Sequence, residues 1–174
     1  NILVTGGAGF IGSHTCLELL NAGHDVIVVD NLSNSSEEAI HRVKELTGKK
    51  ILFYNADLLD YGVIDEIFDA NKVDAVIHFA GLKAVGESNQ IPLTYYRNNV
   101  AGTLSLTEVM EEFGVGKLIF SSSATVYGDP VSVPIDESFA TSATNPYGRS
   151  KLIVEEILRD MAKAPNNAWS ITLL

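Results

Sequence analysis

A glycine-rich turn close to the start of the chain constrains the fold more than any other feature. Residues 5–12 read TGGAGFIG and follow a short apolar run at 2–4. Gly7, Gly9 and Gly12 match the spacing G-x-G-x-x-G, in which one glycine makes a tight turn, one lets the backbone approach a pyrophosphate and one lets helix and strand pack closely. The start of a helix also favours negative charge. The turn therefore predicts a strand, a loop and a helix that together bind a dinucleotide.

An acidic residue stands where such a site needs one. A helix is expected over residues 11–21, and a second buried strand over 26–29 leads to Asp30. An acid in that place holds the adenosine ribose hydroxyls. A 2′-phosphate about 4 Å away would be repelled by roughly 4 kcal/mol at an effective dielectric of about 20. No arginine at positions 31–41 offsets this repulsion, so the sequence favours NAD over NADP. A helix cap or loop role for Asp30 is the alternative.

Short apolar runs alternate with helical stretches along the whole chain. The expected strands are continuous and rich in β-branched or aromatic residues, as strands buried on both faces should be. They lie at residues 2–4, 26–29, 51–54, 75–79, 118–120 and 171–174. The alternation predicts an α/β fold, a doubly wound parallel sheet of the Rossmann type in three αβα layers. Because the chain begins without Met and ends within an apolar run, we expect it to be part of something longer.

Capping residues indicate where the helices begin. Asn34 with Glu37 resembles a capping box, and Asp60 can cap the next helix. A long helix is expected over 92–113. The residues expected near one face of this helix are Leu93, Tyr96, Val100, Leu104 and Thr107. Residues 128–144 are expected to form a loop at the C-terminal edge of the sheet, where ligands bind in open α/β folds.

Composition narrows the class of protein. The 174 residues fit one domain, 1–174, with 46% hydrophobic and 20% charged residues, which is ordinary for a soluble globular protein. The formal net charge of −10 argues against nucleic acid and anionic membranes as partners. The single cysteine, Cys16, cannot form an intrachain disulfide and is expected to be buried. There is no 18-residue apolar run and no signal sequence, so a cytoplasmic location is expected.

The last expected helix carries two chemically distinctive side chains. Asn145 is a good N-cap and Pro146 suits the first helical position. The apolar positions of this helix are Val154, Ile157, Leu158 and Met161. The same stripe extends backwards to Lys151 and then to Tyr147, at the ligand-binding edge of the sheet. Packing of Tyr147 and snorkelling of Lys151 would be the purely structural alternative.

Several blocks of sequence carry a family resemblance. Residues 147–151 read YGRSK, the pattern Y-x-x-x-K, and Ser123 precedes them. Further blocks read TGGAGFIG at 5–12, DNLSNS at 30–35, HFAGLKAVGES at 78–88 and SSSATVYG at 121–128. From end to end, the chain resembles the extended short-chain dehydrogenase/reductase family, and most closely its sugar-nucleotide epimerases.

The resemblance implies that Ser123, Tyr147 and Lys151 are catalytic. A free tyrosine loses its proton near pKa 10, so a base at neutral pH needs a shift of about 3 units, or about 4 kcal/mol. One ammonium about 4 Å away supplies roughly that much at an effective dielectric of about 20. Lys151 lies one helical turn from the tyrosine, and Ser123 would hydrogen-bond the reacting hydroxyl.

The same resemblance implies how NAD and the substrate are held. Residues of the glycine turn lie against the pyrophosphate, residues 30–35 hold the adenosine ribose, and Asp57 with Leu58 frames the adenine. The implied cofactor-binding residues are Gly6, Gly9, Phe10, Ile11, Gly12, Asp30, Asn31, Leu32, Asn34, Ser35, Asp57, Leu58, Phe79, Ala80, Gly81, Leu82, Lys83, Asn98, Tyr147 and Lys151. The implied substrate-binding residues are Lys83, Ser123 and Tyr147. Asp57 could instead cap a turn, and Asn98 could face solvent. No metal site is expected, and His78 is expected to be a satisfied core histidine.

The activity implied by the resemblance is epimerisation at C4 of a UDP-hexose. Tyr147 takes the proton of the 4-hydroxyl while C4 gives a hydride to tightly held NAD, and a transient 4-keto sugar turns before it is reduced again. UDP-galactose and UDP-glucose would thereby interconvert. The full-length protein is expected to be a homodimer with a C-terminal substrate-binding domain that this chain lacks, so the chain alone could bind NAD yet turn nothing over.

Three alternatives stay open at this point. Dehydratases of the family that form 4-keto-6-deoxy sugars carry Asp-Glu after the catalytic Ser/Thr, and decarboxylases carry Glu there. This chain has Ala124-Thr125 instead, which favours epimerisation over elimination. The third alternative is a non-catalytic NAD-sensing domain, which would have no need for Ser123, Tyr147 and Lys151 together.

Overall fold

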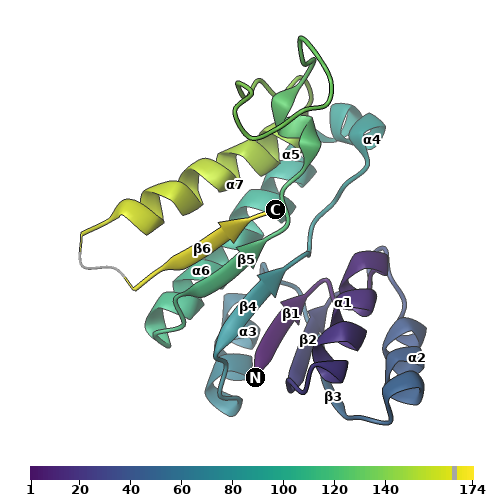
Figure 1. The fold of residues 1–174 in the computed structure, drawn as a ribbon. Helices are drawn as coiled ribbons and strands as arrows, with labels where there is room; N and C mark the ends of the chain where they lie inside the picture. The colour runs from purple at the N-terminus through teal and green to yellow at the C-terminus, as the bar shows by residue number, and fades with distance from the viewer. Residues whose placement is uncertain (166–167) are drawn as a thin grey trace.

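The fold is built on one parallel sheet, seen in a computed structural model that describes residues 1–165 and 168–174 (Figure 1). Within these residues, six strands lie in the order β3-β2-β1-β4-β5-β6, and each neighbouring pair is parallel. The strands are β1 (Ile2–Thr5), β2 (Val26–Asp30), β3 (Ile51–Asn55), β4 (Ala75–His78), β5 (Lys117–Phe120) and β6 (Ser170–Leu173). The predicted doubly wound parallel sheet is confirmed.

Helices cover both faces of the sheet and complete the three predicted layers. The helices are α1 (Phe10–Asn21), α2 (Glu37–Thr47), α3 (Tyr61–Ala70), α4 (Val85–Gln90), α5 (Pro92–Tyr96), the π-helix η1 (Arg97–Ala101), α6 (Gly102–Glu112), the 3-10 helix η2 (Ala124–Tyr127) and α7 (Pro146–Lys163). One face of the sheet packs against α1 and α2, and the other against α3, α6 and α7 (Figure 1). In the part of the chain that the structure describes, no helix is both long and apolar enough to cross a bilayer.

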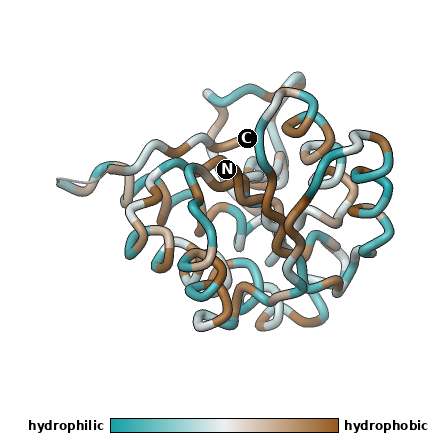
Figure 2. Tube along the Cα trace, turned by 90° about the horizontal axis from the view of Figure 1, so that it is seen from below, coloured by the Kyte–Doolittle hydropathy of each residue, from teal (hydrophilic) through white to brown (hydrophobic). Residues whose placement is uncertain are grey.

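The strands supply two apolar clusters, one on each side of the sheet. Leu3 and Ile27 belong to the cluster beneath α3, α6 and α7, whereas Val4 and Val28 belong to the cluster beneath α1 and α2. Figure 2 shows hydrophobic residues concentrated along the central strands. Burying one such side chain stabilises the fold by about 1.5–3 kcal/mol. Burial on both faces is the reason why these strands read as continuous apolar runs. Cys16 lies in the second cluster, as predicted.

Two of the three proposed helix caps are confirmed. The side chains of Asp60 and Asn145 accept backbone N–H groups at the starts of α3 and α7. The capping box proposed at Asn34 is wrong, because Ser36 is the N-cap of α2 and accepts from the backbone N–H of Glu38. Serine and asparagine cap helices about equally well, so the residue types alone could not choose between the two positions.

The long helix predicted over 92–113 is interrupted by a π turn. Its three segments α5, η1 and α6 follow one another directly. Of the residues expected near one face of this helix, Leu93 is 82% exposed and Leu104 is 38% exposed, whereas Thr107 is buried. The buried residues here include Tyr95, Asn99, Thr103, Leu106 and Met110. The prediction assumed an uninterrupted α-helix, and a π turn has no simple marker such as proline.

The connections of β1 create an opening at the C-terminal edge of the sheet. β1 pairs with β2 on one side and with β4 on the other, so the strand order reverses there. The loops after β1 and β4 lead to opposite sides of the sheet. Ligands bind outside the carboxyl ends of the strands at such a switch point.

Candidate active site

A cavity of about 310 Å³ opens at this switch point. Its volume lies within the range of about 300–1,000 Å³ that is typical of small-molecule sites. The residues that line it come from the loops after β1, β2, β3, β4 and β5, from the end of β2, and from the helices α1, η1 and α7. They are Gly6, Gly9, Phe10, Ile11, Gly12, Val29, Asp30, Asn31, Ser33, Asn34, Ala56, Asp57, Leu58, Phe79, Ala80, Gly81, Leu82, Lys83, Asn98, Ser121, Ser122, Tyr147 and Lys151.

At Gly6 and Gly12, the glycine turn is packed against backbone atoms too closely for a side chain. Gly6 has a φ of 68°, and a Cβ there would lie 2.6 Å from the backbone nitrogen of Ala80. A Cβ on Gly12 would lie 2.2 Å from the carbonyl oxygen of Gly6. These close backbone contacts place the start of α1 at the cavity, which Gly9, Phe10, Ile11 and Gly12 line. This N-terminus has no side-chain cap and no acid in its first turn, so its N–H groups suit an anion.

Asp30 stands at the tip of β2 in a fixed orientation. Its Oδ2 accepts from the backbone N–H of Ala8 at 3.0 Å. Its Oδ1 accepts from the N–H of Leu32 at 3.0 Å and from the hydroxyl of Ser35 at 2.7 Å. Two carboxylate oxygens offer about four acceptor positions, so one remains for a hydroxyl in the cavity.

The ends of β2 and β3 are joined across the cavity wall. Asn31 donates from Nδ2 to Oδ2 of Asp57 at 2.9 Å. Oδ1 of Asp57 accepts from the backbone N–H of Leu59 at 2.9 Å, so Asp57 also caps a turn, as the alternative reading had it. Leu58, the residue between Asp57 and Leu59, is 9% exposed and belongs both to the core and to the lining of the cavity.

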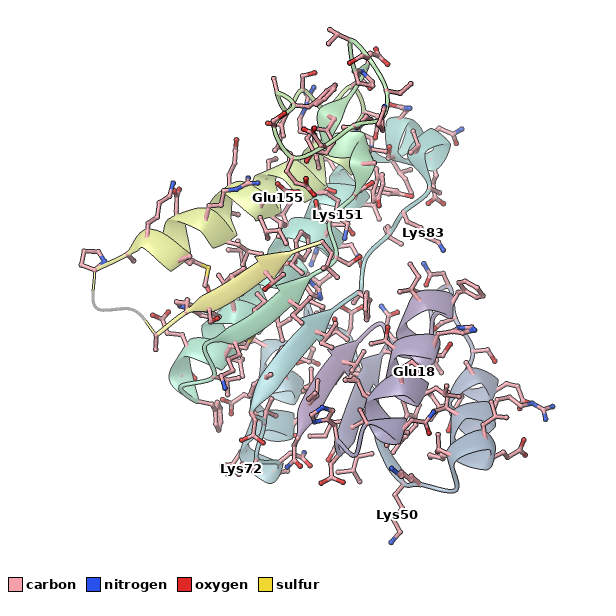
Figure 3. The ribbon with its side chains drawn as sticks, in the orientation of Figure 1. Glu18, Lys50, Lys72, Lys83, Lys151 and Glu155 are labelled. Atoms are coloured by element: carbon pink, nitrogen blue, oxygen red, sulfur yellow. The ribbon has the colours of Figure 1, made fainter. Side chains whose placement is uncertain are left out.

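Lys151 is a buried cation on the opposite side of the cavity (Figure 3). It is 5% exposed, its Nζ donates to the carbonyl oxygen of Ser121 at 2.8 Å, and the same atom lies 4.6 Å from the ring centroid of Phe120. Burial lowers the pKa of Lys151 from 10.5 to about 8. Among residues 1–165 and 168–174, no ion pair involves this ammonium. A hydroxyl or anion bound in the cavity would therefore be attracted to the Lys151 ammonium, whose buried charge is otherwise little compensated.

Tyr147 lines the same cavity, one turn before Lys151 on α7. Ser123 caps the neighbouring η2, where its Oγ lies 2.8 Å from the Thr125 hydroxyl and accepts from the Thr125 N–H at 3.2 Å. The start of α7 touches this turn, because a Cβ on Gly148 would lie 2.7 Å from the Thr125 carbonyl oxygen. Ser123 and Tyr147 therefore come from adjoining segments, although Ser123 itself does not line the cavity.

A buried asparagine that the sequence analysis overlooked organises the segment after β4. Asn99 is 4% exposed. Its Oδ1 accepts from the backbone N–H of Leu82 at 2.8 Å. Its Nδ2 donates to the Leu82 carbonyl oxygen and to Ser150 Oγ, at 3.0 Å each. The predicted Asn98 donates to the same Oδ1 at 3.0 Å and lines the cavity. Lys83, at the end of this segment, is exposed and lines the cavity, and Figure 3 labels it between β4 and α4.

Most of the predicted site residues meet in this one cavity, and three do not line it: Leu32, Ser35 and Ser123. Leu32 packs against the cluster beneath α1 and α2, and Ser35 turns back to Asp30. Residues that line the cavity but were not in the predicted set are Val29, Ser33, Ala56, Ser121 and Ser122. Each of them lies at or just beyond the carboxyl end of a strand, which is the signal that could have found them.

His78 is a core residue at the end of β4, as predicted. Its Nδ1 lies 2.6 Å from the Thr5 hydroxyl and its Nε2 lies 2.8 Å from the Thr103 hydroxyl. Burial, followed by the nearby charge of Lys151, lowers the pKa of His78 to about 3, so the ring is neutral. In the described part of the chain, no three His, Cys, Asp or Glu side chains are grouped to hold a metal.

The arrangement of groups along the cavity suits a dinucleotide. A helix N-terminus suited to phosphate lies at its middle, a carboxylate able to accept ribose hydroxyls lies on one side, and a buried ammonium with a phenol lies on the other. Phe10 and Ile11, 77% and 59% exposed, offer apolar contact at the mouth. The residues present therefore fit a bound NAD.

Comparison with characterised proteins agrees with this arrangement. The chain is 63% identical to the UDP-glucose 4-epimerase of Bacillus subtilis over 99% of its own length and 51% of that protein. It is 59% identical to the UDP-glucose 4-epimerase of Dictyostelium discoideum, covering 50% of that protein. The chain thus spans about half the length of the curated relatives it matches.

A solved structure and a family model extend the comparison. The UDP-glucose 4-epimerase of Bifidobacterium longum, crystallised with NAD⁺ and UDP, superposes with a TM-score of 0.95 at 54% identity; the match covers 99% of this chain and 51% of that one. The model of the NAD dependent epimerase/dehydratase family matches residues 2–173. The chain belongs to the NAD-dependent epimerase/dehydratase family.

Proposed function

We propose that this chain is the NAD-binding part, residues 1–174, of an enzyme that interconverts UDP-galactose and UDP-glucose. The observation that carries the proposal is the meeting of Tyr147 and Lys151 with the glycine turn and Asp30 in one cavity. Relatives with 63% and 59% identity are named UDP-glucose 4-epimerases, and this supports the substrate class. A domain that only senses NAD would have no use for a phenol beside a buried ammonium.

The proposed cofactor is NAD, and each group of the cavity has a role toward it. The first turn of α1 and the close backbone at Gly6 would bind the pyrophosphate. Asp30 would accept from the adenosine ribose hydroxyls, and Asp57 with Leu58 would flank the adenine. When bound, NAD⁺ supplies a hydride acceptor that later returns the same hydride, so none is consumed.

In the proposed reaction, Tyr147 is the acid–base group. Its phenolate takes the proton of the hexose 4-hydroxyl and gives it back when the 4-keto sugar is reduced on its other face. Lys151 stabilises the phenolate and would bind the nicotinamide ribose, and Ser123 would hydrogen-bond the reacting oxygen. Acid–base catalysis of this kind contributes about 10²–10⁴-fold to the rate.

The substrate is proposed to enter beside Lys83, Ser123 and Tyr147. The rest of its binding site is proposed to lie in a C-terminal substrate domain, because the chain covers 51% of the structure crystallised with UDP. We further propose a homodimer, a cytoplasmic location and no nucleic-acid partner. Light scattering of the full-length protein checks the proposed dimer.

The test is to incubate the full-length protein with UDP-galactose and measure UDP-glucose, without added cofactor. Formation of UDP-glucose supports the proposal. A 4-keto-6-deoxy product would instead indicate a dehydratase, although Ala124 and Thr125 offer no carboxylate to protonate a leaving hydroxyl. Absence of turnover, with NAD bound, would favour a non-catalytic NAD-binding protein.

NAD is expected to bind about 100-fold more tightly than NADP, a difference of about 3 kcal/mol. The reason is Asp30, which is 7% exposed and held by three donors, so it cannot turn away from a 2′-phosphate. Titration calorimetry with NAD and with NADP measures the ratio of the two affinities. Asp30→Asn is the matched variant, in which this ratio should be smaller. Equal affinities in the unaltered protein would contradict the assigned role of Asp30.

A further inference from the structure

Glu155 is a buried carboxylate on α7 that stands outside the proposed catalytic set. It lies one turn after Lys151 and is 5% exposed. Its Oε1 accepts from the Ser122 hydroxyl, and its Oε2 accepts from the Arg159 guanidinium at 2.6 Å. Figure 3 shows Glu155 and Lys151 next to each other on α7, above the carboxyl ends of β5 and β6. Carboxylates are almost never buried this deeply unless they are paired, so the contacts of Glu155 define its place.

Lys151 and Glu155 hold two successive residues of the same strand end. Lys151 donates to the carbonyl oxygen of Ser121 at 2.8 Å, and Glu155 accepts from the side chain of Ser122. The backbone of these two serines is also tied to both neighbouring strands, Ser121 N–H to the His78 carbonyl and Ser122 N–H to the Leu174 carbonyl, at 3.1 Å each. Two contacts one helical turn apart fix both the rotation of α7 and its height along β5.

We propose that Glu155 is a positioning residue, which holds the Ser122 hydroxyl and thereby sets where α7 presents Lys151 and Tyr147 to the cavity. This inference rests on the proposed function. Glu155 does not line the cavity, so it acts through Ser122, which does. Without the Ser122 contact, α7 would keep the hydrogen bond from Lys151 to the Ser121 carbonyl but would lose the second contact, one turn further along, that sets its position on this strand end.

The ion pair with Arg159 is a weaker reason for the burial of Glu155 than the contact with Ser122. Arg159 is 45% exposed on its side chain, and i, i+4 pairs with an exposed partner contribute about 0.3–0.5 kcal/mol. A carboxylate needed only for this pair could stay at the surface, as Glu38 does with Arg42, at exposures of 60% and 67%. The contact that requires burial is the one with Ser122.

The kinetic test compares variants of the full-length protein with UDP-galactose as substrate. Glu155→Ala and Ser122→Ala should each lower kcat about 10- to 100-fold, because misplacement of catalytic groups by about 1 Å has effects of that size. For Glu155→Ala, KM should change by less than about 2-fold, since Glu155 makes no contact in the cavity. Glu155→Gln keeps an acceptor for Ser122 and should recover most of kcat. The double variant, with Glu155→Ala and Ser122→Ala together, should be no slower than the slower of the two single variants, because both substitutions break the same contact.

Glu156→Gln is the matched control, an exposed acid on the same helix that should leave kcat unchanged. Thermal unfolding of every variant shows whether each protein is folded at the assay temperature. The proposal is overturned if Glu155→Ala keeps the unaltered kcat, if Glu155→Gln is as slow as Glu155→Ala, or if the losses from Ser122 and Glu155 multiply.

Hydrogen exchange separates this inference from the proposed function. In the full-length protein without substrate, Glu155→Ala should accelerate amide exchange over residues 121–125 at least about 10-fold, whereas Glu156→Gln should not. If the unaltered protein fails to convert UDP-galactose, the proposed function fails, and exchange alone decides on Glu155. Faster exchange confined to 121–125 then supports the positioning role, and unchanged exchange refutes it.

Discussion

Tyr147→Phe is expected to lower the turnover of UDP-galactose by the full-length protein about 10³-fold, within the range lost with an acid–base group. Phenylalanine keeps the ring that lines the cavity on α7 and removes only the hydroxyl. No other group at this position can take the proton of the sugar hydroxyl. NAD should stay bound, because the glycine turn and Asp30 are untouched.

Two measurements check this result. Steady-state assays give kcat, and absorbance after denaturation gives the NAD released per protein molecule. Tyr96→Phe serves as the control, since Tyr96 is a half-buried tyrosine on α5 that does not line the cavity. Turnover within about 10-fold of the unaltered protein would remove Tyr147 from the acid–base role, because even weak general catalysis contributes about 10². Loss of NAD together with turnover would instead indicate a binding role.

The sheet was predictable because its physical signal is local. A strand buried on both faces must be apolar at every position, as Val26–Asp30 is up to its last residue, and such runs are visible without any tertiary information. The start of α7 was predictable for the same reason, because its N-cap Asn145 and the following Pro146 are adjacent in the sequence. The π turn at Arg97–Ala101 was not, because no single residue type marks such a turn, and Asn99 within it bonds to Leu82 and Ser150, which lie elsewhere along the chain.

The site was predictable in outline for a similar reason. Motif residues such as Gly12 and Lys151 are set by backbone approach or by helical spacing, which a sequence displays directly. Buried polar contacts cannot be predicted in this way, because nothing in the local sequence distinguishes Glu155, which is 5% exposed, from the exposed Glu156 beside it. Ser122 was overlooked for the same reason, because its partner lies on another element.

Lys151→Met is expected to lower turnover about 10³-fold, because it removes a charge that would be worth roughly 4 kcal/mol to the Tyr147 phenolate at a separation of about 4 Å and an effective dielectric of about 20. The same change should alter how folding depends on pH. Burial lowers the pKa of Lys151 from 10.5 to about 8 in the folded protein. Below pH 8 the amine is charged in both states, so the folded state bears the full penalty of burying it. Between about pH 8 and 10.5 the folded protein releases this proton and the unfolded chain keeps it, so the penalty fades as the pH rises.

The free energy of unfolding of the unaltered protein should therefore rise relative to that of Lys151→Met as the pH increases from 7 to 10.5, by on the order of 3 kcal/mol. Comparing the two proteins cancels the titration of all other groups, and urea unfolding at several pH values measures the difference. Lys50→Met is the control, because Lys50 is exposed and points away from the molecule (Figure 3). A difference between Lys151→Met and the unaltered protein that stays constant with pH would mean that the amine is hydrated in the folded state. A hydrated amine would stabilise a phenolate about 4 Å away by only about 1 kcal/mol instead of about 4 kcal/mol, too little to lower the pKa of a tyrosine to neutrality, so this stability measurement tests the catalytic assignment without any substrate.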